Sequence, residues 1–149
     1  MNVKIPVTNT KGEFCDALVK KLSDAGVQVN VTALMTLEQV QRVTDALNPD
    51  TPAIISVFAG RIADTGIDPV PVMAKAVEIM KAKPKSELIW ASPRELLNIF
   101  QAEEVGCHII TATNDIIKKL SLFHKDLNAF SLETVETVSY THLRAHETG

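Results

Sequence analysis

The sequence predicts an α/β protein built on a parallel sheet, and three features of the chain point to it. Short runs rich in β-branched residues alternate five times with longer amphipathic stretches. Neither a G-x-G-x-x-G nor a G-x-x-x-x-G-K-[ST] nucleotide loop occurs in the chain. Polar residues stand where the apolar runs end, and these are Thr8, Thr32, Ser56, Ser92 and Thr111. Because the carboxyl ends of barrel strands carry active sites, these polar residues favour part of a (β/α)₈ TIM barrel over an open, doubly wound sheet.

The elements follow from the hydrophobic pattern. The predicted strands, apolar enough to be buried in a parallel sheet covered by helices, are Val3–Thr8, Val27–Leu34, Ala53–Phe58, Glu87–Ser92 and Cys107–Thr111. The predicted helices are Lys11–Ala25, Thr36–Leu47, Val72–Lys83, Pro93–Val105 and Asn114–Leu120. Residues 60–71 are expected to form a loop. Five such units cannot close an eight-stranded barrel alone.

Helix boundaries are marked by capping signals. Thr10 with Glu13, and Thr36 with Gln39, have the spacing of capping boxes. Ser92 precedes a proline and, three residues on, a glutamate, which predicts an N-cap at this serine. Gly26 and Gly106 are expected to end two of the helices.

Composition limits the classes of function. The chain has 149 residues, is 46% hydrophobic and carries a formal net charge of −3, which suits one domain with a buried core. It has no basic block and no apolar run of about 18 residues, so neither nucleic acid nor a membrane is an expected partner. Cys15 and Cys107 are expected to be reduced thiols rather than a disulfide, which fits a cytoplasmic location.

Lys4 is the most informative residue, because it interrupts an apolar strand. On pattern alone, it is either a strand-edge lysine whose stem lies along apolar surface or an amine that lines a barrel interior. In the second case, desolvation disfavours the ammonium form and leaves a nucleophile able to attack a ketone.

Several segments, in order and correctly spaced over residues 1 to about 137, resemble one family. Lys4–Thr8 (KIPVT) is similar to the lysine strand of transaldolases and fructose-6-phosphate aldolases, and Asn30–Ala33 (NVTA) to their next strand. Ser56–Ile62 (SVFAGRI), followed by Asp64, resembles their phosphate-binding loop. The remaining matches are Trp90–Arg94 (WASPR) and Gly106-Cys107. The resemblance implies strands 4 to 8 of a TIM barrel.

The resemblance also implies roles for individual residues. Lys4 would form the Schiff base, Thr32 would position a water for proton transfer, and Asn30 would bind substrate hydroxyls. Ser56 is expected to contact substrate. Arg61, Ser92 and Arg94 are the expected phosphate-binding residues, with an Arg61–Asp64 salt bridge and an N-cap role for Ser92 as alternatives.

Phe58 bears on the reaction. In the family, this position tends to be tyrosine in the aldolases and phenylalanine in classical transaldolases, and only a phenol can assist protonation of the intermediate. The expected activity is therefore that of a transaldolase in the pentose phosphate pathway, acting on sugar phosphates and needing no metal or other cofactor. An aldolase-like lyase, a silent sugar-phosphate-binding fragment and a flavodoxin-like module are the alternatives.

Two departures from the family are expected. Its first three strands, which should carry an aspartate and a glutamate or glutamine, have no counterpart here, so we expect a truncated, poorly active fragment of a protein that could form a homo-oligomer. Residues 138–149 (VSYTHLRAHETG) resemble a translated adapter from DNA sequencing libraries and are expected to be non-native, whereas residues 1–137 are expected to form the barrel portion. The rival interpretation of the tail, a metal site at His142 and His146, rests on a lone i, i+4 histidine pair, which is weak evidence for a metal site.

Overall fold

A computed structural model describes the backbone of residues 2–148 and the side chains as far as Val138. Its centre is a sheet of five parallel strands in the order β1-β2-β3-β4-β5. The strands are β1 (Val3–Pro6), β2 (Val29–Leu34), β3 (Ala53–Val57), β4 (Ser86–Trp90) and β5 (Ile109–Ile110). The prediction of a parallel sheet is therefore confirmed.

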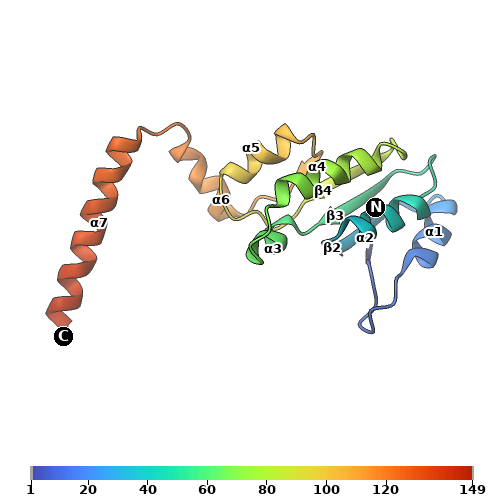
Figure 1. The fold of residues 1–149 in the computed structure, drawn as a ribbon, viewed down its shortest axis with the longest axis horizontal. Coiled ribbons are helices and arrows are strands. Elements are labelled where there is room, and N and C mark those ends of the chain that lie inside the picture. Colours follow the sequence, from blue (N-terminus) through green and yellow to red (C-terminus); the bar gives the residue numbers. More distant parts are fainter. Residues whose placement is uncertain (1, 149) are drawn as a thin grey trace. The chain divides into compact units, whose positions relative to one another are not determined.

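Helices separate the strands along the chain (Figure 1). They are α1 (Asp16–Asp24), α2 (Leu37–Ala46), α3 (Ala59–Asp64), α4 (Pro69–Met80), α5 (Leu97–Glu104), α6 (Asn114–Lys118), the 3₁₀ helix η1 (Lys119–Leu122) and α7 (Leu127–Thr148). The strand order equals the chain order, whereas a doubly wound sheet reverses direction at a switch point. Because crossovers between parallel strands are right-handed, an unreversed order lays the helices on one face, as in an α/β barrel. The sheet is consistent with part of such a barrel.

The two faces of the sheet differ in burial along the first part of the strands, whereas Ser56 and Ile89, further along the second face, are buried. One row of paired residues is buried and belongs to the hydrophobic core; it consists of Ile5, Val31, Ile55 and Leu88. The next row is half-buried or exposed; it consists of Lys4, Asn30, Ile54 and Glu87. The burial pattern is that of a sheet covered by helices on one face, as expected for part of a barrel.

The capping signals give mixed results in the structure. Thr36 accepts a hydrogen bond from the backbone N–H of Gln39, whose side chain accepts from Thr36 in return, so this capping box is confirmed. The prediction of a capping box at Thr10 is wrong, because α1 begins only at Asp16. The Asn9 side chain instead accepts from the N–H groups of residues 11 and 13 and closes a local turn, beside an isolated antiparallel bridge of residues 8 and 14.

Two connections also differ from expectation. The predicted loop at residues 60–71 contains α3 and the start of α4, which Asp68 caps by accepting from the N–H of Val70. Ser92 is not an N-cap: its φ is +60°, and α5 begins only at Leu97. Gly106, with a φ of +83°, follows the end of α5 as expected.

The chain divides after Ile117 into two compact units. In the second unit, α7 continues through the tail to Thr148. The side chains of His142 and His146 lie outside the described residues, and the non-native origin of residues 138–149 stays a prediction. Within the part of the chain that the structure describes, no helix is both long and apolar enough to cross a membrane.

Candidate functional site

The candidate site begins on the sheet face opposite to the helices. Lys4 and Asn30 are direct partners in the parallel register of β1 and β2, and Pro6 and Thr32 are the next pair on that face. The buried hydroxyl of Ser56 donates to the Asn30 side-chain oxygen at 2.8 Å. Because this oxygen accepts from Ser56, the amide nitrogen of Asn30 is the group that remains to donate to a substrate oxygen.

A bulge in β2 follows directly after Thr32. The register runs from Val31 opposite Ile55 to Leu34 opposite Val57, so β2 contains one residue more than β3 over this stretch. Ala33 has a φ of +67°, a left-handed conformation that L-residues other than glycine, asparagine and aspartate seldom adopt. Strained backbone of this kind is often found at functional sites, where the surrounding structure holds it in place.

Lys4 is exposed, which corrects the expectation of an amine buried in a barrel interior. β1 is one of the two edge strands of the five-stranded sheet, and the face that carries Lys4 is not the one the helices cover. The lysine is nevertheless aligned with Asn30 and lies on a strand whose next inward neighbour carries Thr32.

Segments beyond the strand ends are held together by a close backbone contact. The Gly60 N–H donates to the Ala91 carbonyl at 3.2 Å, and a Cβ added at Gly60 would lie 1.6 Å from the Ser92 carbonyl oxygen. Only glycine fits there. α3 therefore rests directly on the turn that follows β4.

Two arginines lie just beyond the carboxyl ends of β3 and β4, at the same end of the strands as Thr32. Arg61 lies in the first turn of α3, directly after β3, and is exposed. Arg94 follows β4, and its Nη2 donates to the Asp64 carboxylate at 2.9 Å. Asp64 thus forms its ion pair with Arg94, whereas the alternative interpretation paired it with Arg61. Phe58, half-buried, is the residue before α3, and its N–H donates to the Leu34 carbonyl at 2.9 Å.

The expected site residues thus form two groups. Lys4, Asn30, Thr32 and Ser56 share one sheet face, whereas Phe58, Arg61, Ser92 and Arg94 lie on the segments beyond β3 and β4. Sequence reasoning missed the structural role of Gly60 and the partner of Asp64. A glycine immediately before an arginine after an apolar strand was the available signal for a close backbone approach.

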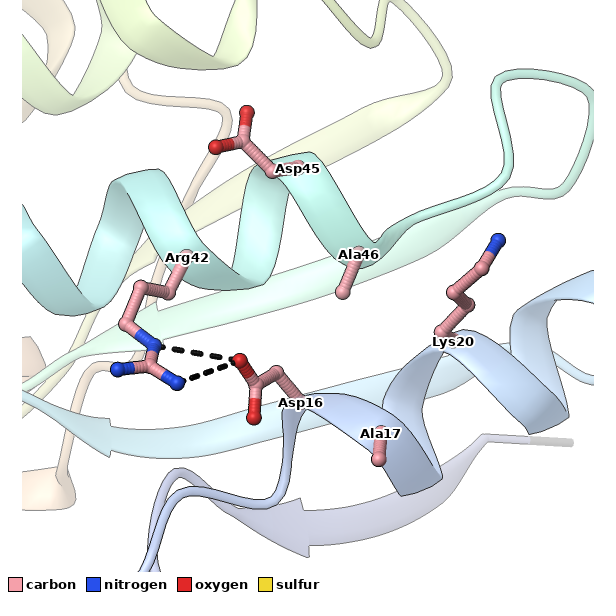
Figure 2. Close-up of a pocket in the computed structure, with 6 residues that line it drawn as sticks. All are labelled: Asp16, Ala17, Lys20, Arg42, Asp45 and Ala46. Atoms are coloured by element: carbon pink, nitrogen blue, oxygen red, sulfur yellow. Dashed lines mark hydrogen bonds and ion pairs between the residues drawn. The ribbon is translucent and has the colours of Figure 1, made fainter.

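A separate depression of about 340 Å³ lies on the helical side, lined by α1 and α2 (Figure 2). Arg42 points at Asp16 there and donates through Nε at 3.2 Å and Nη2 at 2.8 Å, whereas Lys20 and Asp45 point away from the pair. The hydrogen bond from Arg42 holds the pKa of the Asp16 carboxyl below its ordinary value of 3.8. This arginine also covers the ring of Phe14 at 3.7 Å, so the cluster joins α2 both to α1 and to the segment before it.

Cys15 and Cys107 are free thiols, and burial raises the pKa of Cys107 above its ordinary value of 9.0. A raised pKa disfavours the nucleophilic thiolate. The described residues hold no cluster of three or more His, Cys, Asp or Glu side chains that could bind a metal ion.

Comparison with known proteins finds relatives over most of the chain. A probable transaldolase of Clostridium acetobutylicum is 32% identical over 121 residues, which are 80% of this chain and 53% of that protein. A probable transaldolase of Rhizorhabdus wittichii is 29% identical over 139 residues, 91% of this chain and 60% of that protein. The chain therefore spans about half the length of the curated relatives it matches. The model of one family, transaldolase/fructose-6-phosphate aldolase, matches residues 1–147. With nearly the whole chain matched, this protein belongs to the transaldolase/fructose-6-phosphate aldolase family.

Proposed function

We propose that the protein is a transaldolase that moves a dihydroxyacetone unit between sugar phosphates through a Schiff base on Lys4. The observation that carries the proposal is the alignment of Lys4 with Asn30, whose side-chain oxygen accepts from Ser56 on the same sheet face. An amine with amide and hydroxyl groups beside it suits a ketose, whose ketone carbon lies between hydroxyl-bearing carbons. Membership of the family supports the same chemistry.

The proposed reaction uses the lysine as an electron sink. The amine attacks the ketone carbon, and loss of water gives an iminium. The C3–C4 bond then breaks, its electron pair flows toward the iminium nitrogen, and an aldose phosphate leaves as the C4 hydroxyl gives up its proton. The enamine that remains on Lys4 attacks an acceptor aldehyde, which takes up a proton, and hydrolysis releases the new ketose phosphate. Thr32, on the same face as Lys4, would hold the water that carries these protons.

The phosphate end of the substrate would bind beyond the strand ends. Arg61 and Arg94 lie on two segments that meet where Gly60 contacts Ser92. Guanidinium groups match phosphate oxygens in geometry and charge. Two guanidinium groups at the carboxyl end of the strands therefore favour a dianionic substrate over a neutral sugar. The ketone would then face Lys4, further back along the strands.

Borohydride trapping tests the proposal in this chain. Fructose 6-phosphate and sodium borohydride should add one reduced ketose to the peptide that contains Lys4, as read by mass spectrometry after proteolysis. Lys4→Arg should abolish this adduct, whereas the matched control Lys11→Arg, which alters an exposed lysine outside the strands, should leave it. Equal labelling of Lys4 and Lys11 in the unaltered chain would show non-selective modification and exclude the Schiff-base role. A silent sugar-phosphate-binding domain would then be the better description.

An aldolase-like release of free dihydroxyacetone is the second candidate, because the family description includes fructose-6-phosphate aldolases. Phe58 favours transfer, since a phenyl ring offers no acid that could help protonate the enamine. Phe58→Tyr should therefore raise the fraction of the enamine that is released as free dihydroxyacetone rather than passed to an acceptor aldehyde. Free dihydroxyacetone as the main product of the unaltered protein would favour the aldolase.

A further inference from the structure

We infer that Asp64 is a positioning residue for the phosphate-binding site, acting by holding the Arg94 side chain toward α3. The inference rests on the proposed function and adds to it a residue that need not touch the substrate. It concerns where the phosphate-binding arginine points before substrate arrives.

The ion pair joins segments that are far apart in sequence. Asp64 is the last residue of α3, and Arg94 lies in the connection between β4 and α5, so the contact spans 30 residues. Both side chains are 53% exposed. Exposed ion pairs contribute little to the free energy of unfolding, because water solvates both partners and salt screens them. The pair is therefore better suited to orienting a flexible side chain than to stabilising the fold.

The backbone beneath both partners is already fixed. α3 rests on the turn after β4 through the Gly60–Ser92 contact, and Ser92 itself has a φ of +60°. The N–H of Arg94 donates to the Asn98 side chain at 2.9 Å, which ties the backbone of this arginine to α5. The ion pair with Asp64 restricts the long side chain of Arg94 in advance, and such preorganisation lowers the entropic cost of binding an anion.

The position of the pair agrees with this role. Arg61 lies on α3, the helix that Asp64 ends, so an Arg94 side chain directed at Asp64 is also directed at the segment that carries Arg61. Within the ion pair, Arg94 donates to Asp64 through Nη2 at 2.9 Å. The opposite expectation is that the Asp64 carboxylate competes with phosphate for Arg94 and repels it. In the first case, removal of the carboxylate weakens phosphate binding, and in the second case it strengthens phosphate binding.

Phosphate titration distinguishes these expectations. Isothermal titration calorimetry would measure the binding of inorganic phosphate to the unaltered chain, to Asp64→Ala and to Asp64→Glu. Asp50→Ala is the matched control, because it removes one exposed carboxylate before β3, at the opposite end of the strands. Asp64→Ala should weaken binding by about threefold to fivefold relative to the control, with an unchanged urea midpoint. Asp64→Glu should recover most of the affinity.

Each other outcome contradicts the inference. Binding by Asp64→Ala that equals or exceeds that of Asp50→Ala would identify a bystander or a competitor. A lower urea midpoint without a change in affinity would identify a purely structural contact. If the unaltered chain binds no phosphate, the phosphate site of the proposed function fails together with this inference. If it binds phosphate and traps a ketose on Lys4 while Asp64 has no effect, this inference alone is wrong.

Discussion

Gly60→Ala tests the contact on which the phosphate-binding edge depends. The added Cβ would lie 1.6 Å from the Ser92 carbonyl oxygen and 2.7 Å from its carbon, so α3 and the turn after β4 must separate. Overpacking of this kind costs about 3 kcal/mol at the upper end of its usual range. Alanine in place of glycine in a helix recovers about 1 kcal/mol. The expected net loss is about 2 kcal/mol, which lowers the urea midpoint by about 1 M for a protein of this size.

The assay combines urea unfolding, followed by circular dichroism, with phosphate titration at low urea. Gly66→Ala is the matched control, because its φ of +85° strains an alanine although nothing lies within 4 Å of the added Cβ. The free energy of unfolding of Gly66→Ala should fall by about 1 kcal/mol, and this variant should still bind phosphate. Gly60→Ala should lose both stability and affinity for phosphate. A Gly60→Ala chain with an unaltered midpoint and unaltered phosphate binding would refute the reasoning.

Three further predictions concern stability and reactivity. Thr36→Ala removes the hydroxyl that accepts from the Gln39 N–H and should lower the free energy of unfolding in urea by about 1 kcal/mol, whereas Thr36→Ser should keep most of that stability. Because Arg42 lowers the pKa of Asp16, the pair stabilises the fold above about pH 4 and loses this contribution as the pH falls; Asp16→Asn should therefore narrow the difference between urea midpoints at pH 7 and pH 3. Cys107, whose pKa burial raises, should react with iodoacetamide more slowly in the folded chain than in urea, and equal rates would contradict this.

The predictable parts of the fold are those set by local pattern. Alternating β-branched runs and amphipathic stretches were sufficient for five parallel strands, and the Thr36 capping box needs only residues three apart. The failed capping signals have identifiable competitors. Asn9 satisfies backbone N–H groups that a helix starting at Thr10 would otherwise use. Ser92 has every local sign of an N-cap, yet the contact with Gly60 from another segment accompanies a left-handed backbone there.

The candidate site, like the fold, was predictable only where it depends on local sequence pattern. Period-two alternation indicates that Asn30 and Thr32 share a strand face, and that needs no knowledge of other strands. The Asn30–Ser56 hydrogen bond spans 26 residues and the Asp64–Arg94 pair spans 30, so both depend on register and on how α3 packs. Sequence patterns of local range carry no information on such contacts, so the only partner that they offer Asp64 is its near neighbour Arg61.

The bulge at Ala33 connects the stability of the sheet to the chemistry of its open face. With strict alternation, residue 34 would lie on the same face as Asn30 and Thr32, and a leucine there would leave the core. The extra residue in β2 brings Leu34 opposite Val57, where it is fully buried. Thr32 therefore remains on the face of Lys4 while the next large side chain returns to the helices. The left-handed Ala33 costs on the order of 1 kcal/mol, which is less than the about 2 kcal/mol gained by burying a leucine. A strained residue can thus persist beside the proposed proton-transfer site because the core, rather than the site, holds it in place.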